Sequence, residues 1–504
     1  MSERIPPGQV YPTPAPAVTR RKRRPGVTIA YPSNQSLQTP LTVSPPSGAP
    51  RPRLTFLGTG YLGATYAICF AEMGYDVLGF DIDEAKIAKL AAGEVPFHEP
   101  GLDELLRKNL GTGRLRFTTS YDEVADFGDV HFICVGTPQR ADGLAADLSY
   151  VESAVTGLAQ RLHRKALIVG KSTVPVGTAE WVEDMVRRLS PPEATVEVAW
   201  SPEFLQEGFA VEDVLRPNRV IFGVKSEWAQ AMLYAAHKGV FDLAQTEDRE
   251  VPIVVTDFAT AELVKVAANA FLATKISFIN AMAEVCEASG ADVTQLARAI
   301  GYDPRIGNKF LRAGLGFGGA CLPKDIRAFQ ARAQELGVGE ALRFLHEVDL
   351  INIRRRQRVV QLAAELLERP NGPAGPDLSG LRIAVLGATF KPNSDDVRDS
   401  PALSVAGKLG RTGATVVVYD PEGLANAERE LPDVHYAKTL SDAVSRADLV
   451  CVLTEWEEFR NADPVALAEL AAGRRVIDAR NCLDQAVWVR AGWVYRGMGR
   501  PALT

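Results

Sequence analysis

The residues best suited to chemistry lie in a glycine-rich stretch at residues 314–325, which reads Gly-Leu-Gly-Phe-Gly-Gly-Ala-Cys-Leu-Pro-Lys-Asp. Glycine lets a backbone wrap closely around a ligand. Cys321, with Lys324 close by, is a candidate nucleophile with a lowered pKa. The alternative is a small buried hydrophobe, the usual role of a free cysteine, which is what we expect for the other five cysteines.

Two further polar pairs have helical spacing. Lys265 and Asn269 are four residues apart on a largely apolar predicted helix, so they share one face. Lys265 is either a surface lysine with a buried stem or a cation beside a developing oxyanion. Glu203 and Glu207 are also four apart, after a strand end. They could serve as general base and as positioner of substrate or water, or they could be a first helical turn enriched in glutamate.

A dinucleotide-binding pattern lies near the beginning of the predicted globular region. Gly58-Thr59-Gly60-Tyr61-Leu62-Gly63 has the spacing GxGxxG and falls between a predicted strand and a predicted helix. Gly58 permits the tight turn, Gly60 the approach of a pyrophosphate, and Gly63 close packing of helix on strand. Asp81 ends the next strand, where a carboxylate accepts hydrogen bonds from a ribose and repels a 2′-phosphate. The pattern therefore predicts NAD rather than NADP.

Alternating strands and helices must position these groups. Strands are predicted at 54–58, 75–81, 130–136, 166–170 and 196–200, with helices at 61–73 and 84–92. From 256 to 368 the pattern is helical and includes one helix over 261–289. Strand 381–387, helix 402–410 and strand 414–420 follow. Segments 115–138 and 435–454 echo each other in element order. The fold class predicted is α/β, with two Rossmann-like doubly wound parallel-sheet domains joined by a helical middle domain.

Four regions follow from this pattern. We expect a disordered Pro-rich tail over 1–50, a NAD-binding Rossmann domain over 51–250, a helical central domain over 251–370, and a second Rossmann-like domain over 371–504. In the last, the turn Gly387–Pro392 is a poor pyrophosphate cradle. It could bind another nucleotide through Lys391 and Arg398.

Composition excludes several classes of protein. The 504-residue chain carries a formal charge of −6, of which the first 50 residues contribute +5, and an acidic body argues against nucleic acid. No apolar run approaches the ~20 residues of a membrane span. Six scattered cysteines without a CxxC pair, and no histidine at ligand spacing, predict a cytoplasmic protein without a metal site. The basic run at 20–24 is either a solvated tail or a contact for an anionic partner.

Together these motifs identify a resemblance over residues 53–498. In order, they are the GxGYxG turn at Gly58, Glu99-Pro100-Gly101-Leu102, Val135-Gly136-Thr137-Pro138, Lys171 to Thr178, Pro202-Glu203-Phe204-Leu205, the Lys265/Asn269 segment, Arg305-Ile306-Gly307, the Cys321 loop, Phe390 to Arg398, and Asp478-Ala479-Arg480-Asn481. The chain resembles the UDP-glucose/GDP-mannose dehydrogenase family.

The resemblance implies a four-electron oxidation of a nucleotide sugar at C6, with UDP-glucose as the expected substrate and two NAD⁺ as acceptors. Cys321 would hold the aldehyde as a thiohemiacetal, which becomes a thioester and is hydrolysed to the uronate. Lys265 and Asn269 would stabilise oxyanions, and Glu203 would act as base. Thr137 and Asp325 would hold water and orient Lys265.

Binding residues are implied in the same way. For NAD they are Gly58, Gly60, Tyr61, Leu62, Gly63, Asp81, Lys86, Thr137, Thr173, Glu207, Lys324 and Arg398. For the nucleotide sugar they are Glu203, Phe204, Leu205, Lys265, Asn269, Arg305, Phe310, Arg312, Gly318, Phe390, Lys391 and Arg480. The family pattern also implies a homodimer or higher oligomer, built on the middle helices, in which Arg305 reaches the neighbouring subunit's site.

Departures from the family pattern leave alternatives open. Ala320, Leu322, Ala281, Ser394 and Asp399 replace residues common in the family, and the changes beside Cys321 bear on sugar and base preference. The same chemistry on dTDP-glucose, GDP-mannose or a UDP-N-acetylhexosamine is one alternative. A two-electron β-hydroxyacid dehydrogenase and a non-catalytic NAD-binding regulator are others, although neither would need Cys321.

Overall fold

The computed structural model describes residues 51–369, 371–372 and 375–502. The expectations for the Pro-rich tail and its basic run therefore lie outside the described residues.

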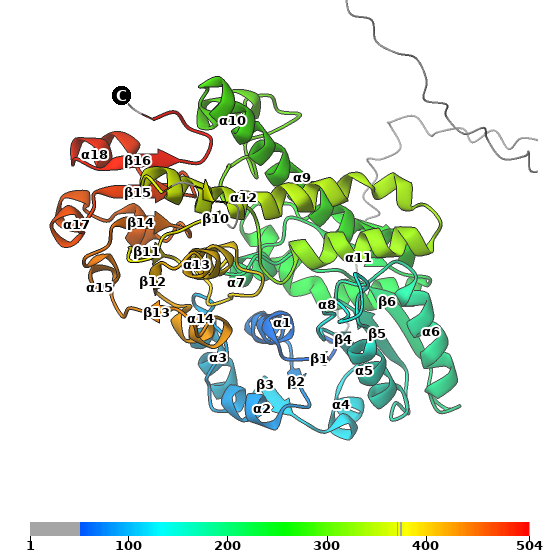
Figure 1. Ribbon diagram of the computed structural model, residues 1–504. Helices are drawn as coiled ribbons and strands as arrows, with labels where there is room; N and C mark the ends of the chain where they lie inside the picture. Colours follow the sequence, from blue (N-terminus) through cyan, green and yellow to red (C-terminus); the bar gives the residue numbers. More distant parts are fainter. Residues whose placement is uncertain (1–50, 370, 373–374, 503–504) are drawn as a thin grey trace, which may run out of the picture. The chain divides into compact units, whose positions relative to one another are not determined.

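The first domain is built on an eight-stranded sheet with the order β3-β2-β1-β4-β5-β6-β7-β8 (Figure 1). Its strands are β1 (Leu54–Leu57), β2 (Val77–Phe80), β3 (Leu115–Thr118), β4 (Val130–Ile133), β5 (Ala166–Gly170), β6 (Val196–Trp200), β7 (Val220–Gly223) and β8 (Ile253–Thr256). Strands β1 to β6 are parallel, as predicted, because helices connect them across the sheet faces.

The end of this sheet departs from the prediction. Strands β7 and β8 were not predicted, and β7 runs antiparallel to β6, with Trp200 opposite Gly223. The connection over 201–219 returns to the sheet at the edge where β6 ended, so it makes no crossover and the direction reverses. This connection carries Glu203 and Glu207.

Helices cover both faces of this sheet. They are α1 (Tyr61–Glu72), α2 (Glu84–Ala91), α3 (Leu102–Gly111), α4 (Tyr121–Phe127), α5 (Ser149–Ala159), α6 (Thr178–Leu189), α7 (Ala210–Leu215) and α8 (Glu227–Thr246). Buried aromatic rings pack between α1 and the sheet, with Phe56 and Phe132 stacked at 4.9 Å between centroids. This packing holds the beginning of α1 at the edge of the sheet where β1 ends.

The middle of the chain is helical, as predicted, with α9 (Phe258–Ser289), α10 (Val293–Gly301), α11 (Leu322–Glu335), the short 3₁₀ helix η2 (Gly339–Leu342) and α12 (Phe344–Leu366). The 32-residue α9 begins at an Asp257 cap and ends at Gly290, whose φ is 75°. By length and hydropathy α9 is capable of spanning a membrane. It packs instead against α11 and α12 and buries Glu262, Lys265 and Asn280, as a core helix does.

The last domain repeats the topology of β1 to β6. Its sheet has the order β13-β12-β11-β14-β15-β16, wholly parallel. The strands are β11 (Arg382–Leu386), β12 (Thr415–Tyr419), β13 (His435–Tyr436), β14 (Leu449–Val452), β15 (Arg475–Asp478) and β16 (Val494–Gly497). The helices are α13 (Pro401–Arg411), α14 (Leu424–Glu430), α15 (Leu440–Val444), α16 (Glu457–Arg460), α17 (Pro464–Leu470) and α18 (Gln485–Arg490). The echo seen in the sequence is thus a repeat of spatial strand order. Short strands β9 (Asn371–Gly372) and β10 (Gly375–Pro376) pair within the predicted linker.

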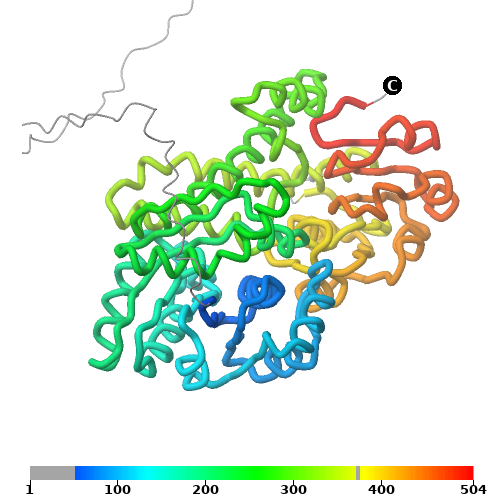
Figure 2. Tube along the Cα trace, turned by 180° about the vertical axis from the view of Figure 1, so that it is seen from behind, coloured from blue at the N-terminus to red at the C-terminus, as the bar shows by residue number. Residues whose placement is uncertain are grey.

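The residues after β16 lie against the middle helices. Figure 2 shows the red end of the trace beside the green α9–α10 segment. The Val293 amide donates to the Gly499 carbonyl over 2.9 Å, and the Gly499 amide donates to Glu287 over 3.0 Å. The last domain is thereby attached to the far end of α9.

Candidate active site

The Cys321 loop is held by side chains of its own middle domain and of the last domain. Asn352 on α12 accepts from the Phe317 amide (2.7 Å) and donates to its carbonyl (2.9 Å). Asn280 on α9 accepts from the Gly314 amide (2.9 Å). From the last domain, Arg480 donates to the Gly316 carbonyl (3.1 Å). The loop therefore has a fixed path up to Cys321, which caps α11.

Lys265 and Glu203 form a buried ion pair beside this loop. Their Nζ and Oε1 atoms are 2.9 Å apart, and Lys265 is 5% exposed. Burial, the largest effect on the Lys265 pKa, lowers it, but Glu203, Cys321 and Asp325 together outweigh burial and raise the pKa. The surface-lysine alternative is therefore wrong.

Asp325 joins a second chain of contacts. The Asn269 amide donates to Asp325 Oδ2 over 2.7 Å, and Lys324 Nζ lies 2.6 Å from Oδ1. The Asp325 amide donates to the Cys321 carbonyl over 3.0 Å. The structure therefore gathers Cys321, Lys265, Asn269, Glu203 and Asp325 in one place, from three separate segments.

The expectation that Cys321 has a lowered pKa is wrong. Cys321 is exposed by surface area, yet loss of hydration is the largest cause that raises its pKa, to about 11. Asp325 and Glu203 raise the pKa further, and Lys265 and Lys324 only partly oppose them. The sequence places Lys324 and Asp325 close to the cysteine but does not show that Glu203 adds a second negative charge.

The other cysteines follow the expectation with one exception. Cys69, Cys134, Cys286 and Cys451 are buried, whereas Cys482 is half-exposed with its Sγ 3.6 Å from Asp478. Among the described residues, no group of three or more His, Cys, Asp or Glu side chains is arranged to hold a metal ion.

The GxGxxG turn has the features that a pyrophosphate needs. Gly58 has a φ of 92°, and a Cβ on Gly63 would lie 1.9 Å from the Gly58 carbonyl oxygen. A Cβ on Gly60 would meet nothing within 4 Å, so space is open at the beginning of α1. No side chain caps α1, which leaves the amides of its first turn, from Tyr61 and Leu62 onward, free for an anion. Residues present here fit NAD.

Asp81 lies at the end of β2, as predicted. Its Oδ2 accepts from the Thr59 amide (2.9 Å) and pairs with Lys86 (2.8 Å). Burial raises the Asp81 pKa, but Lys86 and the backbone donors outweigh it, so the pKa is lowered. The carboxylate is thus ionised beside the turn, where it disfavours a 2′-phosphate.

A small cavity brings together residues that we expect at the cofactor and residues that we expect at the catalytic group. It is lined by Thr137, Thr173, Lys324 and Asp325 among others. The Thr137 hydroxyl donates to the Thr173 carbonyl over 2.7 Å. Residues expected at the cofactor and at the catalytic group therefore share one cavity.

Glu207 joins the first and last domains. Its carboxylate accepts from Ser394 (3.1 Å) and lies 3.5 Å from Arg398, which also pairs with Asp396. Burial and the Asp396 charge raise the pKa of Glu207. Residues 201–206 are not helical and α7 begins only at Ala210, so the helical-turn alternative for Glu203 and Glu207 is wrong.

Several predicted sugar-binding residues lie around the Lys265–Glu203 pair and the Cys321 loop. The Phe204 ring centre is 5.5 Å from Lys265 Nζ, and the Leu205 amide donates to Glu203. Arg480 donates to the Phe390 carbonyl (3.0 Å). A Cβ on Gly318 would lie 2.3 Å from the Asp399 carbonyl. Burial lowers the pKa of Lys391, with Glu207 and Cys321 opposing it.

The second sheet lacks a comparable dinucleotide site for a physical reason. Asp420, the counterpart of Asp81, is fully buried and accepts from the Thr389 amide (3.0 Å) and from Trp456 (3.1 Å). A Cβ on Gly387 would lie 2.5 Å from Thr454. The expectation that this turn is a poor pyrophosphate cradle agrees with this packing.

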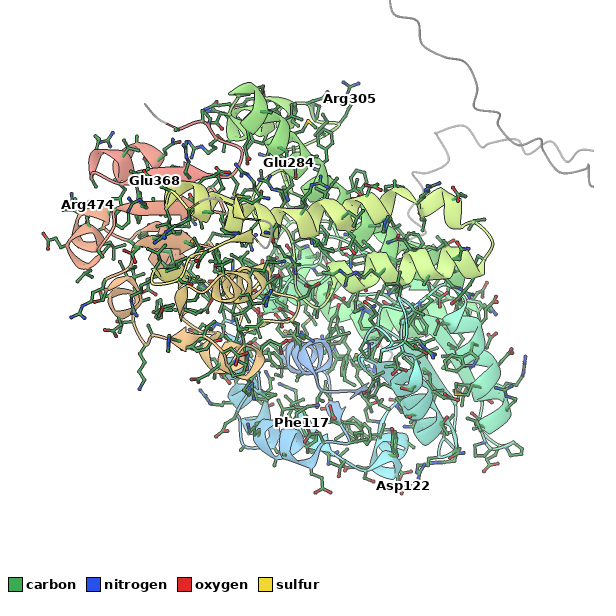
Figure 3. The ribbon with its side chains drawn as sticks, viewed as in Figure 1. Phe117, Asp122, Glu284, Arg305, Glu368 and Arg474 are labelled. Atoms are coloured by element: carbon green, nitrogen blue, oxygen red, sulfur yellow. The ribbon has the colours of Figure 1, made fainter. Side chains whose placement is uncertain are left out.

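Arg305 and Phe310 are not brought to Cys321 within the described chain. The Arg305 side chain is 87% exposed and pairs with Asp303 (2.6 Å). Figure 3 shows it at the rim, pointing outward. Phe310 is exposed with a φ of 62°. Arg312 lies 3.8 Å from Glu455, which also contacts Arg480.

Two buried glutamates were missed as functional residues by the sequence analysis. Glu99 accepts from the Gly208 (2.6 Å) and Ala210 (2.7 Å) amides at the beginning of α7. Glu262 accepts from the Gly177 (2.7 Å) and Ala179 (2.6 Å) amides at the beginning of α6. Glu99 belongs to a quoted motif, and Glu262 lies one helical turn before Lys265. The motif around Glu99 and the helical spacing between Glu262 and Lys265 were sequence signals that could have identified these two residues.

The fold and the site define an NAD-binding dehydrogenase with a thiol beside an ammonium–carboxylate pair. Models of the UDP-glucose/GDP-mannose dehydrogenase family match three regions: the NAD-binding domain at residues 52–240, the central domain at 259–354 and the UDP-binding domain at 384–485. The chain belongs to this family, and it is an NAD-dependent nucleotide-sugar dehydrogenase.

Individual relatives agree with this assignment. The chain is 41% identical to a UDP-glucose 6-dehydrogenase of Rhizobium meliloti (strain 1021), over 89% of this chain and 100% of the relative. A UDP-glucose dehydrogenase structure from Pyrobaculum islandicum superposes with a TM-score of 0.81 at 36% identity, covering 90% and 99% of the two chains. A UDP-D-ManNAc dehydrogenase from Pyrococcus horikoshii gives 0.75 at 30%, covering 89% and 99%.

Proposed function

We propose that this chain oxidises UDP-glucose at C6 to UDP-glucuronate through a covalent intermediate on Cys321. The observation that carries the proposal is the convergence of Cys321 with the Lys265–Glu203 pair and the Asn269–Asp325 contact. A two-electron dehydrogenase would not require the Cys321 thiol. A non-catalytic NAD-binding protein would not require the buried Lys265–Glu203 pair.

NAD⁺, when bound, supplies the hydride acceptor. The amides at the beginning of α1, Asp81 with Lys86, and the cavity lined by Thr137 and Thr173 are the groups that would hold it. Glu207, Lys324 and Arg398 are the charged residues that we assign to the same ligand. Leu62 and Tyr61 contribute their backbone in the first turn of α1.

The chain's own residues account for the two stages of oxidation. In the first, Lys265 and Asn269 donate hydrogen bonds to the C6 oxygen as the hydroxyl loses its proton and C6 loses a hydride to the acceptor, which leaves an aldehyde. In the second, the Cys321 thiol loses its proton as its sulfur bonds to the aldehyde carbon, and the same donors hold the resulting oxyanion. Loss of a second hydride from C6 to a second acceptor then leaves the thioester. One such donor typically contributes ~10²–10³ in rate.

Hydrolysis completes the reaction. Glu203 takes a proton from water as the water oxygen attacks the thioester carbon, and the carbon–sulfur bond breaks to restore the Cys321 thiolate. Thr137 and Asp325 hold water and keep Lys265 oriented. Overall, one alcohol, two NAD⁺ and one water give one carboxylate, two NADH and three protons.

We also propose that the protein forms a homodimer through α9 and α12. On α9, Phe271, Phe278 and Val285 are exposed at seven-residue spacing, which forms one apolar stripe. Phe344 and Ile353 on α12 are exposed as well. An outward Arg305 agrees with a role in a neighbouring subunit's site.

We also propose the limits of the three domains and a cytoplasmic location for the protein. The domains are 51–250, 251–370 and 371–504, which contain the three matched family regions. Free cysteines throughout the described residues support a reducing cytoplasm.

The decisive experiment counts NADH formed per UDP-glucose consumed at saturating NAD⁺. We expect two for the wild type and for Cys482→Ala, a matched control cysteine. We expect no uronate from Cys321→Ala. A wild-type ratio of one, or uronate from Cys321→Ala, would contradict the thiol mechanism.

The substrate is tested by comparing kcat/KM among nucleotide sugars. UDP-glucose is expected to exceed dTDP-glucose, GDP-mannose and UDP-N-acetylmannosamine by at least tenfold. The last of these is included because a structural relative is a UDP-D-ManNAc dehydrogenase. A higher value for any competitor would replace UDP-glucose and leave the mechanism intact.

A further inference from the structure

A second small cavity lies at the edge of the first sheet and contains buried charged groups that the reaction above does not use. We call it the Lys171 cavity, after its most buried charge; Ser201, Phe204, Asp213, Arg219 and His237 are among its lining residues. Lys171 directly follows β5, Ser201 directly follows β6, and Arg219 directly precedes the antiparallel β7. All three therefore meet at one sheet edge, the edge at which open α/β sheets bind ligands.

The charges of this cavity are unbalanced. Lys171 is 2% exposed and its ammonium donates to the Ser201 carbonyl (3.0 Å), its one hydrogen bond among the described residues, with the Tyr66 ring 4.4 Å away. Within the described residues, neither Lys171 nor Arg219 forms an ion pair: no carboxylate oxygen lies within 4.0 Å of either cationic group. Loss of hydration lowers the pKa of Lys171 to about 8. A buried cation that no carboxylate contacts directly is costly, and an anionic partner in the cavity would offset that cost.

The other polar groups agree with this reading. The Ser201 hydroxyl is buried and has no hydrogen-bond partner in the part of the chain that the structure describes. Asp213 is the carboxylate on the wall, and it accepts from the Gln206 amide (2.8 Å). His237 is uncharged, because burial lowers its pKa to about 3. The cavity thus offers two cations and a free hydroxyl donor against one engaged carboxylate.

We propose that the Lys171 cavity binds a small oxyanion, held by the Lys171 ammonium and the Arg219 guanidinium, with the Ser201 hydroxyl as a further donor. The shared chemistry is a compact group of negatively charged oxygens, as in inorganic phosphate or a small carboxylate. The cavity lining includes Phe204 and Leu205, which we assign to the nucleotide sugar, but not Cys321, Lys265, Asn269 or Glu203. The cavity therefore adjoins the active site without containing the reacting groups.

The occupant has a direct structural route to the active site. Arg219 lies 3.6 Å from the centre of the Phe204 ring, and the same ring is 5.5 Å from Lys265 Nζ. Ser201, whose carbonyl holds Lys171, is two residues before Glu203. An anion that draws Arg219 toward Lys171 therefore acts on the segment that carries the Lys265–Glu203 pair.

The test is a calorimetric titration of the full chain with sodium phosphate and, separately, with sodium acetate. NADH and UDP are added at saturation so that the proposed cofactor and nucleotide sites are occupied. We expect one saturable anion per chain. The tighter of the two anions identifies the source as phosphate or carboxylate. Because the readout is binding, its failure is distinguishable from failure of the proposed oxidation.

Variants connect the binding to this cavity. Arg219→Gln is expected to weaken it at least tenfold, and Lys171→Met to abolish it. Arg216→Gln is the matched control, because Arg216 pairs with Glu212 and Glu247 and does not line the cavity. If Lys171→Met does not fold, Arg219→Gln still decides. No saturable heat with either anion, or equal affinity in Arg219→Gln and wild type, would overturn the proposal.

Discussion

Cys321 lies between two carboxylates and two ammonium groups, and the balance of these charges sets its reactivity. Burial with Asp325 and Glu203 raises the thiol pKa, while Lys265 and Lys324 lower it. With a pKa of about 11 the sulfur is mainly protonated at neutral pH, and the protonated form is the less reactive one. Removing one of the carboxylates should lower the pKa of Cys321, and removing one of the ammonium groups should raise it.

Alkylation kinetics test this balance. Asp325→Asn removes a negative neighbour, so the pKa of Cys321 should fall below about 11. The iodoacetamide rate at pH 8 should then rise, because a larger fraction of the sulfur is thiolate. Lys265→Met removes a positive neighbour and should slow the reaction. The measurement is the pH profile of single-site alkylation, with Cys321→Ser as the blank. Equal rates in wild type and both variants would contradict the assigned charges.

At the scale of elements, buried side chains fix the loops that carry the site. Glu262 on α9 caps α6 through two amides, and Arg332 on α11 donates to the Val176 carbonyl (2.9 Å). The segment around Thr173 is thus held by two helices of the middle domain. The Cys321 loop is held in the same manner by Asn280 and Asn352.

The pH dependence of stability tests the Glu262 cap. Burial raises the pKa of Glu262 to about 7 in spite of its amide donors. The folded state therefore binds a proton that the unfolded state releases near pH 4.5, so stability falls as pH rises from about 4.5 to 7 and is level above. The effect is on the order of 3 kcal/mol. The unfolding-midpoint advantage of wild type over Glu262→Gln should shrink between pH 5 and pH 7.5. A constant difference would exclude this assignment.

A glycine substitution tests the path of the Cys321 loop. In Gly318→Ala the new Cβ would lie 2.3 Å from the Asp399 carbonyl oxygen and 2.5 Å from Pro401 Cδ. The loop must shift off the last domain, so kcat should fall at least about 100-fold, as misplacement by an ångström can cause. Gly111→Ala, at the end of α3, meets nothing within 4 Å and is the control. Equal turnover by the two variants would show that the contact is dispensable.

At the scale of the whole molecule, the catalytic groups depend on the meeting of three domains. Glu207 of the first domain contacts Ser394 and Arg398 of the last, and Arg480 of the last holds the Cys321 loop of the middle. The apolar stripe on α9 is left exposed by these contacts, and it is the surface that we assign to a second copy.

The oligomeric state tests that assignment. Phe271 is 67% exposed, so Phe271→Glu should not harm folding but should convert the dimer to a monomer in sedimentation analysis. Val465→Glu on α17 is the control, since Val465 is also exposed (57%) but lies outside the stripe. If Arg305 completes the neighbouring site, the Phe271→Glu monomer loses turnover as well. An unchanged dimer would place the interface elsewhere.

Local patterns in the chain were sufficient to predict most of the secondary-structure elements and several residues of the site. The GxGxxG turn, Asp81 after β2, the uninterrupted α9 and the glycine-rich loop before Cys321 all depend on neighbours within a few residues. Backbone conformation and hydrophobic period are local, so these features could be predicted without coordinates. The family resemblance added roles to residues but not their contacts.

The features that the sequence did not predict depend mainly on contacts between residues far apart in the chain. Glu207 and Ser394 are 187 residues apart, and Glu262 and Gly177 are 85 apart. The reversal of β7, the Lys265–Glu203 pair and the raised pKa of Cys321 likewise arise where distant segments meet. Electrostatic energy and burial depend on distance in space rather than along the chain, so folding alone brings these groups into a working site.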